Sequence, residues 1–143
     1  MKAKLILLLS IVLLSSCNGT KEKKLSKEEK IQKSISKKVK SVLKNPDSFK
    51  FVSMKIKKTI TVGERKKTMT KEYLEKVKGL SDDLYNQAKT ELEFLDKQTD
   101  PNKEAVYYVD FEAMGTNSFG ALIKNKFSAT VLNDENYTVV HLK

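Results

Sequence analysis

The chain has 143 residues and a formal net charge of +10, from 28 Lys and Arg against 18 Asp and Glu. With one cysteine and one histidine it has no thiol pair for an internal disulfide and no cluster of ligands for zinc or copper, so we expect no metal and no cofactor. The length suits one domain with a modest hydrophobic core.

The start of the chain has the three parts of a secretory signal peptide. Lysines near the first residue are followed by residues 5–14, which are apolar apart from one serine, and then by the small residues Ser15 and Ser16. A transmembrane helix needs roughly 20 apolar residues, so this run is too short for a permanent span. We therefore expect export and removal of residues 1–16, with plain secretion or a retained membrane helix as the alternatives.

Leu14-Ser15-Ser16-Cys17 resembles the lipobox of bacterial lipoproteins. The resemblance covers residues 1–17 and implies cleavage between Ser16 and Cys17, then attachment of diacylglycerol and usually of an amide-linked acyl chain to Cys17. Each buried CH₂ contributes about 0.8 kcal/mol, so two or more chains hold a protein firmly on a bilayer. The resemblance thus implies an exported protein, anchored by lipid to a bacterial membrane. An asparagine rather than an aspartate after the cysteine favours the outer membrane.

The chain accordingly divides into a lipoprotein signal peptide (1–16), the lipidated cysteine with a short tether (17–25) and one domain (26–143). The eight tether residues after the cysteine reach at most about 26–29 Å, so the domain would stay beside its membrane. A lysine close to an anionic leaflet contributes about 1 kcal/mol. We therefore expect the lipid bilayer, an anionic lipid or envelope polymer, or a protein as partner, and no nucleic acid, because the chain is exported.

Residues 27–44 are predicted to form a helix. Ser26 and Glu29 have the spacing of a capping box, and Asn45-Pro46 ends the helix because the residue before proline avoids helical angles. Apolar residues recur at spacings of three and four: Ile31, Ile35, Val39, Val42 and Leu43. Lysines fill the opposite face, and three of them are candidate contacts to a membrane or partner: Lys30, Lys33 and Lys37.

Residues 52–62 change to a period of two, with apolar side chains alternating with serine, lysine and threonine. This pattern predicts a strand that is buried on one face. Gly63-Glu64 indicates a turn after it, and residues 65–70 could either return as a short second strand or stay a loop.

Helical spacing returns over residues 71–98. Gly79 lies inside this run, where a glycine costs about 1 kcal/mol relative to alanine. Ser81 could cap a new helix. The segment is therefore either one long helix or two shorter helices that meet near Gly79.

Three strands close the chain, at residues 107–113, 121–131 and 137–142, where apolar and polar residues alternate again. A glycine-containing loop (115–120) and a turn (133–136) join them. The fold class is therefore α+β: helix, strand and helix, followed by a three-strand antiparallel meander. We expect the helices to pack on one face of the sheet, because that arrangement buries the apolar stripes.

Two stretches resemble motifs of small exported bacterial proteins and lipoproteins of uncharacterised function. LKNPDSFKF, at residues 43–51, resembles L-K-D/N-P-x-S-x-K-F, and NSFGA, at residues 117–121, resembles N-S-F-G-G/A. The resemblance extends over residues 31–142. Both motifs also suit turns, since Asp and Ser bond to nearby backbone and Gly adopts angles that other residues avoid. Asn117 and Phe119 are the loop's candidate contacts to a partner.

The sequence contains no nucleophile elbow, zinc-protease motif or phosphate-binding glycine loop, so we predict no catalytic residues. His141 fits a packing position in the last strand. Asp110 and Glu112 share a strand face about 7 Å apart, which could serve glycoside hydrolysis, although carboxylates there more often meet lysines. We therefore predict a membrane-anchored, noncatalytic envelope lipoprotein with a binding or structural role. The alternatives are an inhibitor or immunity-type protein against a secreted enzyme or toxin, and an enzyme acting on cell wall or glycan.

Overall fold

The computed structural model describes residues 24–116 and 119–143. The predicted signal peptide, Cys17 and most of the predicted tether therefore lie outside the described residues. In chain order, the described elements are α1 (Lys27–Val42), the 3₁₀ helix η1 (Pro46–Ser48), β1 (Lys50–Thr61), α2 (Val62–Lys66), α3 (Lys71–Val77), α4 (Asp82–Asp96), β2 (Glu104–Thr116), β3 (Leu122–Leu132) and β4 (Val139–Leu142).

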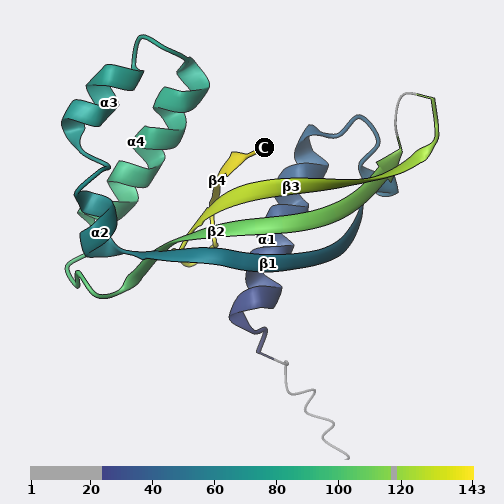
Figure 1. The fold of residues 1–143 in the computed structure, drawn as a ribbon, viewed down its shortest axis with the longest axis horizontal. Helices are drawn as coiled ribbons and strands as arrows, with labels where there is room; N and C mark the ends of the chain where they lie inside the picture. The colour runs from purple at the N-terminus through teal and green to yellow at the C-terminus, as the bar shows by residue number, and fades with distance from the viewer. Residues whose placement is uncertain (1–23, 117–118) are drawn as a thin grey trace, which may run out of the picture.

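The strands form an antiparallel sheet in the order β1-β2-β3-β4 (Figure 1). β2 and β3 make the longest hairpin, which runs from the pair Val106 and Leu132 to the pair Thr116 and Leu122. Helices α2, α3 and α4 are inserted between β1 and β2. The predicted α+β class is confirmed, with a helix, a strand and a helical segment before a three-strand meander.

Helix α1 covers one face of the sheet through two isoleucines (Figure 1). Ile31 and Ile35 are fully buried and share a core cluster with Tyr107 and Phe111 of β2. The Phe111 ring stacks on the ring of Phe127 of β3, with centroids 5.3 Å apart. The apolar stripe predicted for the first helix is therefore the face that packs on the sheet.

The first turn of α1 is fixed both by its cap and by contacts to β2. The Ser26 hydroxyl accepts a hydrogen bond from the Glu29 backbone N–H at 3.2 Å, and the Glu29 carboxylate accepts one from the Ser26 N–H at 2.7 Å. The Lys27 ammonium lies 3.2 Å from the Glu104 carboxylate, which also accepts a hydrogen bond from the Tyr107 hydroxyl at 2.8 Å. The start of the helix is thus tied to the start of β2.

The helices do not all lie on one face of the sheet, which corrects the expected packing. Successive side chains of a strand point to opposite faces, so Val106 and Tyr107 face opposite ways. Val106 belongs to a second core cluster, together with Leu132 of β3 and Leu95 of α4. Helix α4 therefore covers one end of the face opposite α1. The physical reason is the apolar run at residues 105–109 of β2, which needs cover on both sides.

The segment after β1 forms the short helix α2 rather than a turn, and no strand follows in residues 65–70. Thr61 and Glu64 form a capping box, with the Thr61 hydroxyl accepting from the Glu64 N–H at 3.3 Å. The Gly63 N–H donates to the Pro101 carbonyl at 2.9 Å. A Cβ at Gly63 would lie 3.1 Å from that oxygen, so the close approach of α2 to this turn favours glycine.

Residues 71–98 form two helices, which resolves the alternative left open by the sequence. Helix α3 ends at Val77 and α4 begins at Asp82. Ser81 is the N-cap of α4, as predicted, and its hydroxyl accepts from the Leu84 N–H at 3.5 Å. The two helices form a hairpin that stands at one end of the sheet (Figure 1).

Strand β1 lies at the edge of the sheet and its pairing with β2 is irregular. The register shifts at three places, between Phe51 and Ser53, between Ile56 and Lys58, and between Ile60 and Thr61. Exposed lysines also follow one another along its middle: Lys55, Lys57 and Lys58. Register shifts and lysines both discourage the pairing of an edge strand with a further strand.

The contacts at the start of α1 make stability depend on pH. The Tyr107 hydroxyl and the Lys27 ammonium lower the pKa of Glu104. The ionised carboxylate therefore stabilises the fold fully above the unfolded pKa of about 4.3, and this stabilisation is lost as the pH falls through the lower folded pKa. Glu104→Gln should reduce the free energy of unfolding by about 0.5–1 kcal/mol at pH 7, because the ion pair is partly exposed.

Urea unfolding of the wild type and the variant at several pH values measures this difference. The two stabilities should converge as the solution is acidified, since a protonated glutamate resembles glutamine. A difference that stays constant from pH 7 to the acid limit of folding would contradict a role for the ionised carboxylate.

Candidate functional site

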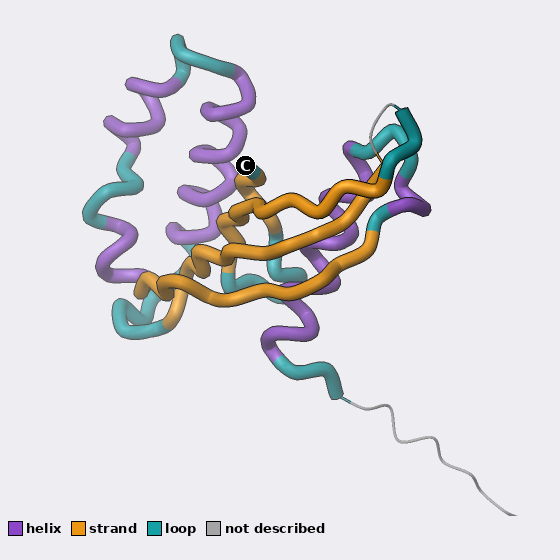
Figure 2. The backbone as a smooth tube through the Cα atoms, turned by 45° about the vertical axis from the view of Figure 1, so that its right-hand side comes forward, coloured by secondary structure: helices purple, strands orange, loops and turns teal. Residues whose placement is uncertain are grey.

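The two sequence motifs meet at one end of the sheet. The Ser48 hydroxyl, in the first motif, accepts a hydrogen bond at 3.1 Å from the backbone N–H of Thr116, the residue before the second motif. The Asn45 amide lies 3.4 Å from the Thr116 hydroxyl. Figure 2 shows the end of α1, η1 and the β2–β3 hairpin side by side at this end. Ser48 therefore holds the first motif against the hairpin.

A small apolar cavity of about 140 Å³ lies at the junction of the motifs. Its lining includes Val39 and Leu43 of the α1 end, Phe49 before β1, and Ile123 and Phe127 of β3. Leu43 and Ile123 also reach the surface, where they are 37 % and 39 % exposed. The cavity thus opens beside an apolar surface at the end of the hairpin.

The tip of the β2–β3 hairpin presents Phe119 to the surface, where the side chain is 91 % exposed. The Phe119 side chain therefore lies at the surface rather than in the core. Gly120 has a φ of 81°, a left-handed conformation that favours glycine and explains the glycine of the second motif. Asn117, the other predicted contact of this loop, lies outside the described residues.

The three predicted lysine contacts follow one another along α1 at spacings of three and four, with Lys33 and Lys37 on the side opposite Ile31 and Ile35. Lys33 and Lys37 are exposed. Lys30 is partly buried, with its ammonium 5.9 Å from the centre of the Tyr137 ring. Lys40 extends the same face by one more turn. We call this row the lysine face of α1: Lys30, Lys33, Lys37 and Lys40.

Asp110 and Glu112 lie on the open part of the sheet face opposite α1, beside a hollow of about 640 Å³. Each contacts a lysine: Asp110 lies 3.5 Å from Lys57, and Glu112 lies 2.6 Å from Lys124. The bond from Lys124 lowers the pKa of Glu112. The acid catalyst of a glycosidase needs a carboxyl with a raised pKa. This arrangement therefore favours a structural role for the two ion pairs over acid catalysis.

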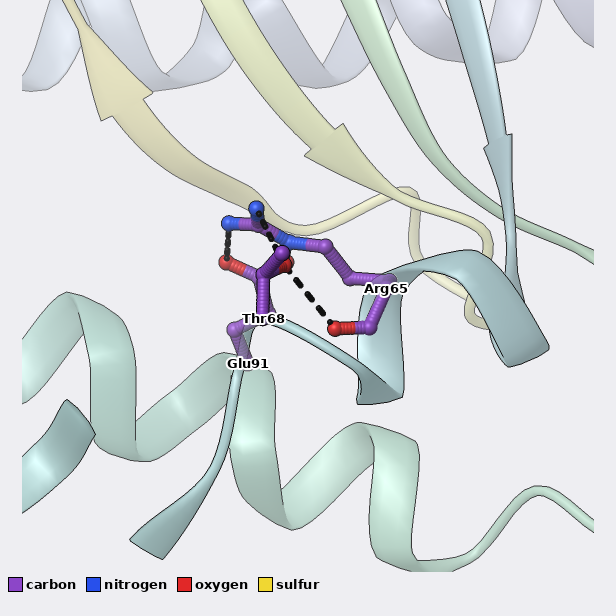
Figure 3. Close-up of polar contacts among 3 residues, drawn as sticks. All are labelled: Arg65, Thr68 and Glu91. Carbon is purple, nitrogen blue, oxygen red and sulfur yellow. Dashed lines mark hydrogen bonds and ion pairs between the residues drawn. The ribbon is translucent and has the colours of Figure 1, made fainter. Parts of the chain in front are cut away.

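A buried ion pair joins α2 to α4 (Figure 3). Arg65 donates from Nε to one oxygen of Glu91 and from Nη2 to the other at 2.9 Å. Glu91 is only 4 % exposed, and the hydrogen bond to it raises the pKa of Arg65. The Thr68 hydroxyl accepts from Arg65 Nη1 at 3.4 Å and donates to the Arg65 carbonyl at 3.1 Å. The pair fixes the helical hairpin to α2.

Sequence reasoning missed this ion pair. Glu91 shares the buried face of α4 with Ala88 and Leu95, a position where an ionised carboxylate requires a cation. The available signal was Arg65, the only arginine in a chain whose other basic residues are lysines. A planar guanidinium is the side chain suited to a bidentate buried pair.

His141 lies beside this pair rather than in the core. Its Nδ1 is 3.0 Å from Oε1 of Gln87, so it links β4 to α4. Both residues line a cavity of about 200 Å³, together with Arg65 and Tyr73. The packing position predicted for His141 is thus corrected to an exposed one, because the ring bonds to the Gln87 side chain at the surface of α4.

Searches across the described residues, 24–116 and 119–143, found neither a helix long and apolar enough to cross a membrane nor three His, Cys, Asp or Glu side chains grouped as metal ligands. No family model, curated protein or solved structure matches the chain.

Arg65→Ala is expected to lower the free energy of unfolding by about 3 kcal/mol, because it leaves the buried Glu91 carboxylate without its cation. Lys89→Ala is the matched control, since Lys89 and Glu93 form an exposed pair on the same helix, 4.0 Å apart. That change should cost less than about 0.5 kcal/mol. Urea unfolding followed by circular dichroism measures both, and similar small effects would show that Arg65 is dispensable.

Proposed function

We propose that this protein is a membrane-anchored, noncatalytic lipoprotein of the bacterial cell envelope. It is exported, cut before Cys17, acylated at Cys17 and held with the lysine face of α1 toward an anionic lipid or envelope polymer. The lysine face supports the part of the proposal that concerns the anionic lipid or envelope polymer. It occupies the first helix after the tether and points away from the sheet.

The position of the lysines supports contact with an anionic surface. The lysine face has a basic residue at each turn of α1, and the helix's two acidic residues, Glu28 and Glu29, both lie in its first turn. Each lysine near an anionic leaflet contributes about 1 kcal/mol, so the four lysines together add to the binding energy that an acyl anchor supplies. Salt weakens this electrostatic contribution. The anchor would thus hold the domain at the membrane while the lysine face orients it.

The two alternatives have less support. An enzyme acting on wall or glycan would use Asp110 and Glu112, but both carboxylates contact lysines and the pKa of Glu112 is lowered. An inhibitor or immunity-type protein would use the hairpin around Phe119 as a wedge. The exposure of that side chain favours contact with a partner but does not by itself favour a protein over a membrane.

Mass spectrometry of the protein isolated from bacterial membranes tests the anchor. The expected N-terminal residue is Cys17 carrying the mass of a diacylglycerol and an acyl chain, with residues 1–16 absent. Cys17→Ser should abolish this modification and prevent cleavage. A Cys17→Ser variant that still partitions into detergent, together with a wild-type protein that has no added lipid mass on Cys17, would overturn the proposal.

Vesicle binding of residues 18–143, which lack the lipidated cysteine, tests the lysine face. The doubly substituted Lys33→Gln, Lys37→Gln protein should bind anionic vesicles roughly 30-fold more weakly at low salt, as the loss of about 1 kcal/mol per lysine implies. The control neutralises the exposed Lys71 and Lys76 of α3 instead. Equal losses in the two variants would show that general charge, not this face, governs binding.

A further inference from the structure

Five apolar side chains gather at the end of the molecule where the two motifs meet. Exposed fractions are 68 % for Val42 and 37 % for Leu43 at the end of α1, and 91 % for Phe119, 50 % for Leu122 and 39 % for Ile123 in the hairpin. Leu43 and Ile123 line the same small cavity, which connects the helix end to the hairpin. We call this surface the hairpin patch: Val42, Leu43, Phe119, Leu122 and Ile123.

The hairpin patch projects beyond the rest of the sheet. The pairing of β1 with β2 ends at Met114, whereas β2 and β3 continue for two further pairs, to Thr116 and Leu122. Strand β4 pairs with β3 only at the other end of that strand. Figure 1 shows the hairpin extending past α1, away from the α3–α4 hairpin. The tip can therefore contact a flat surface while the body of the domain stays away from it.

Lysines border the apolar side chains. Lys44 follows Leu43, and Lys50 pairs across the sheet with Met114. Lys124 pairs with Met114 from the other side and is held by its ion pair with Glu112. An apolar centre with a lysine border is typical of segments that lie in the interface of an anionic bilayer, where ammonium groups stay among the headgroups.

We propose that the hairpin patch inserts into the interfacial layer of an anionic phospholipid bilayer. This inference rests on the proposed function, because it assumes that the domain is held at a membrane. The charge of the border favours anionic phospholipid over a protein surface of mixed charge. The acyl chains at Cys17 are one point of attachment. Insertion of the hairpin patch gives a second point, and two points fix the orientation of the domain.

The size of the cavity decides between insertion of the patch and extraction of a lipid. Its volume of about 140 Å³ is below the 300–1,000 Å³ of pockets that enclose a small-molecule ligand. It cannot enclose a phospholipid acyl chain. The apolar side chains therefore enter the bilayer, and the lipid stays there.

A tryptophan at the tip tests the insertion, because the chain contains no tryptophan of its own. The mature, lipidated Phe119→Trp protein is reconstituted into vesicles of phosphatidylglycerol and phosphatidylcholine. Its emission should move to shorter wavelength and should be quenched by brominated acyl chains. The matched control is Leu80→Trp, because Leu80 is also an exposed apolar residue, at 73 %, but lies in the turn between α3 and α4. Its emission should stay that of a water-exposed indole.

Flotation of the same vesicles separates the two proposals. Protein that floats with Trp emission unchanged at position 119 would overturn insertion and leave the anchor standing, whereas protein that does not float contradicts the anchor. A shift to shorter wavelength without vesicles, growing with protein concentration, would assign the hairpin patch to a second copy of the chain. Equal quenching at positions 119 and 80 would also overturn the inference.

Discussion

The fold depends on the burial of β2 on both faces. Val106 and Tyr107 are adjacent and fully buried, yet they belong to two different core clusters. Because successive strand residues face opposite ways, one cluster needs α1 and the other needs α4. The helices inserted between β1 and β2 are therefore not an appendage, since they supply the second cover for the central strand. The uncovered remainder of that face carries polar side chains such as Asp110 and Glu112, which would be costly to bury.

Much of this could be predicted from sequence because local chemistry and the final packing agree. The capping box at Ser26, the apolar stripe of α1 and the N-cap at Ser81 are short-range signals, and each forms in the structure. The alternation in residues 107–113 predicts burial on one side only, so it does not reveal the packing on two faces. The apolar residues Ala105 and Val106, just before that range, carried the missing information.

The candidate site was harder to predict because its parts are far apart in the chain. Sequence reasoning selected both motifs, but nothing local shows that Ser48 bonds to the backbone of Thr116 across 68 residues. The same limit applies to Arg65 and Glu91, whose pairing depends on how α2 meets α4. What the sequence did supply was the residue types: a row of lysines on one helix and an aromatic residue in a glycine loop. The structure adds their relative positions.

The irregular edge of β1 has a consequence for a protein confined to a surface. Confinement in two dimensions raises the chance that copies meet side by side in a similar orientation, which is the geometry that lateral sheet extension needs. The register shifts along β1 interrupt the row of backbone groups such an encounter would use, and the exposed Lys55 and Lys58 add like-charge repulsion. Under crowded conditions, copies of this domain would therefore not pair with one another through their β1 edges.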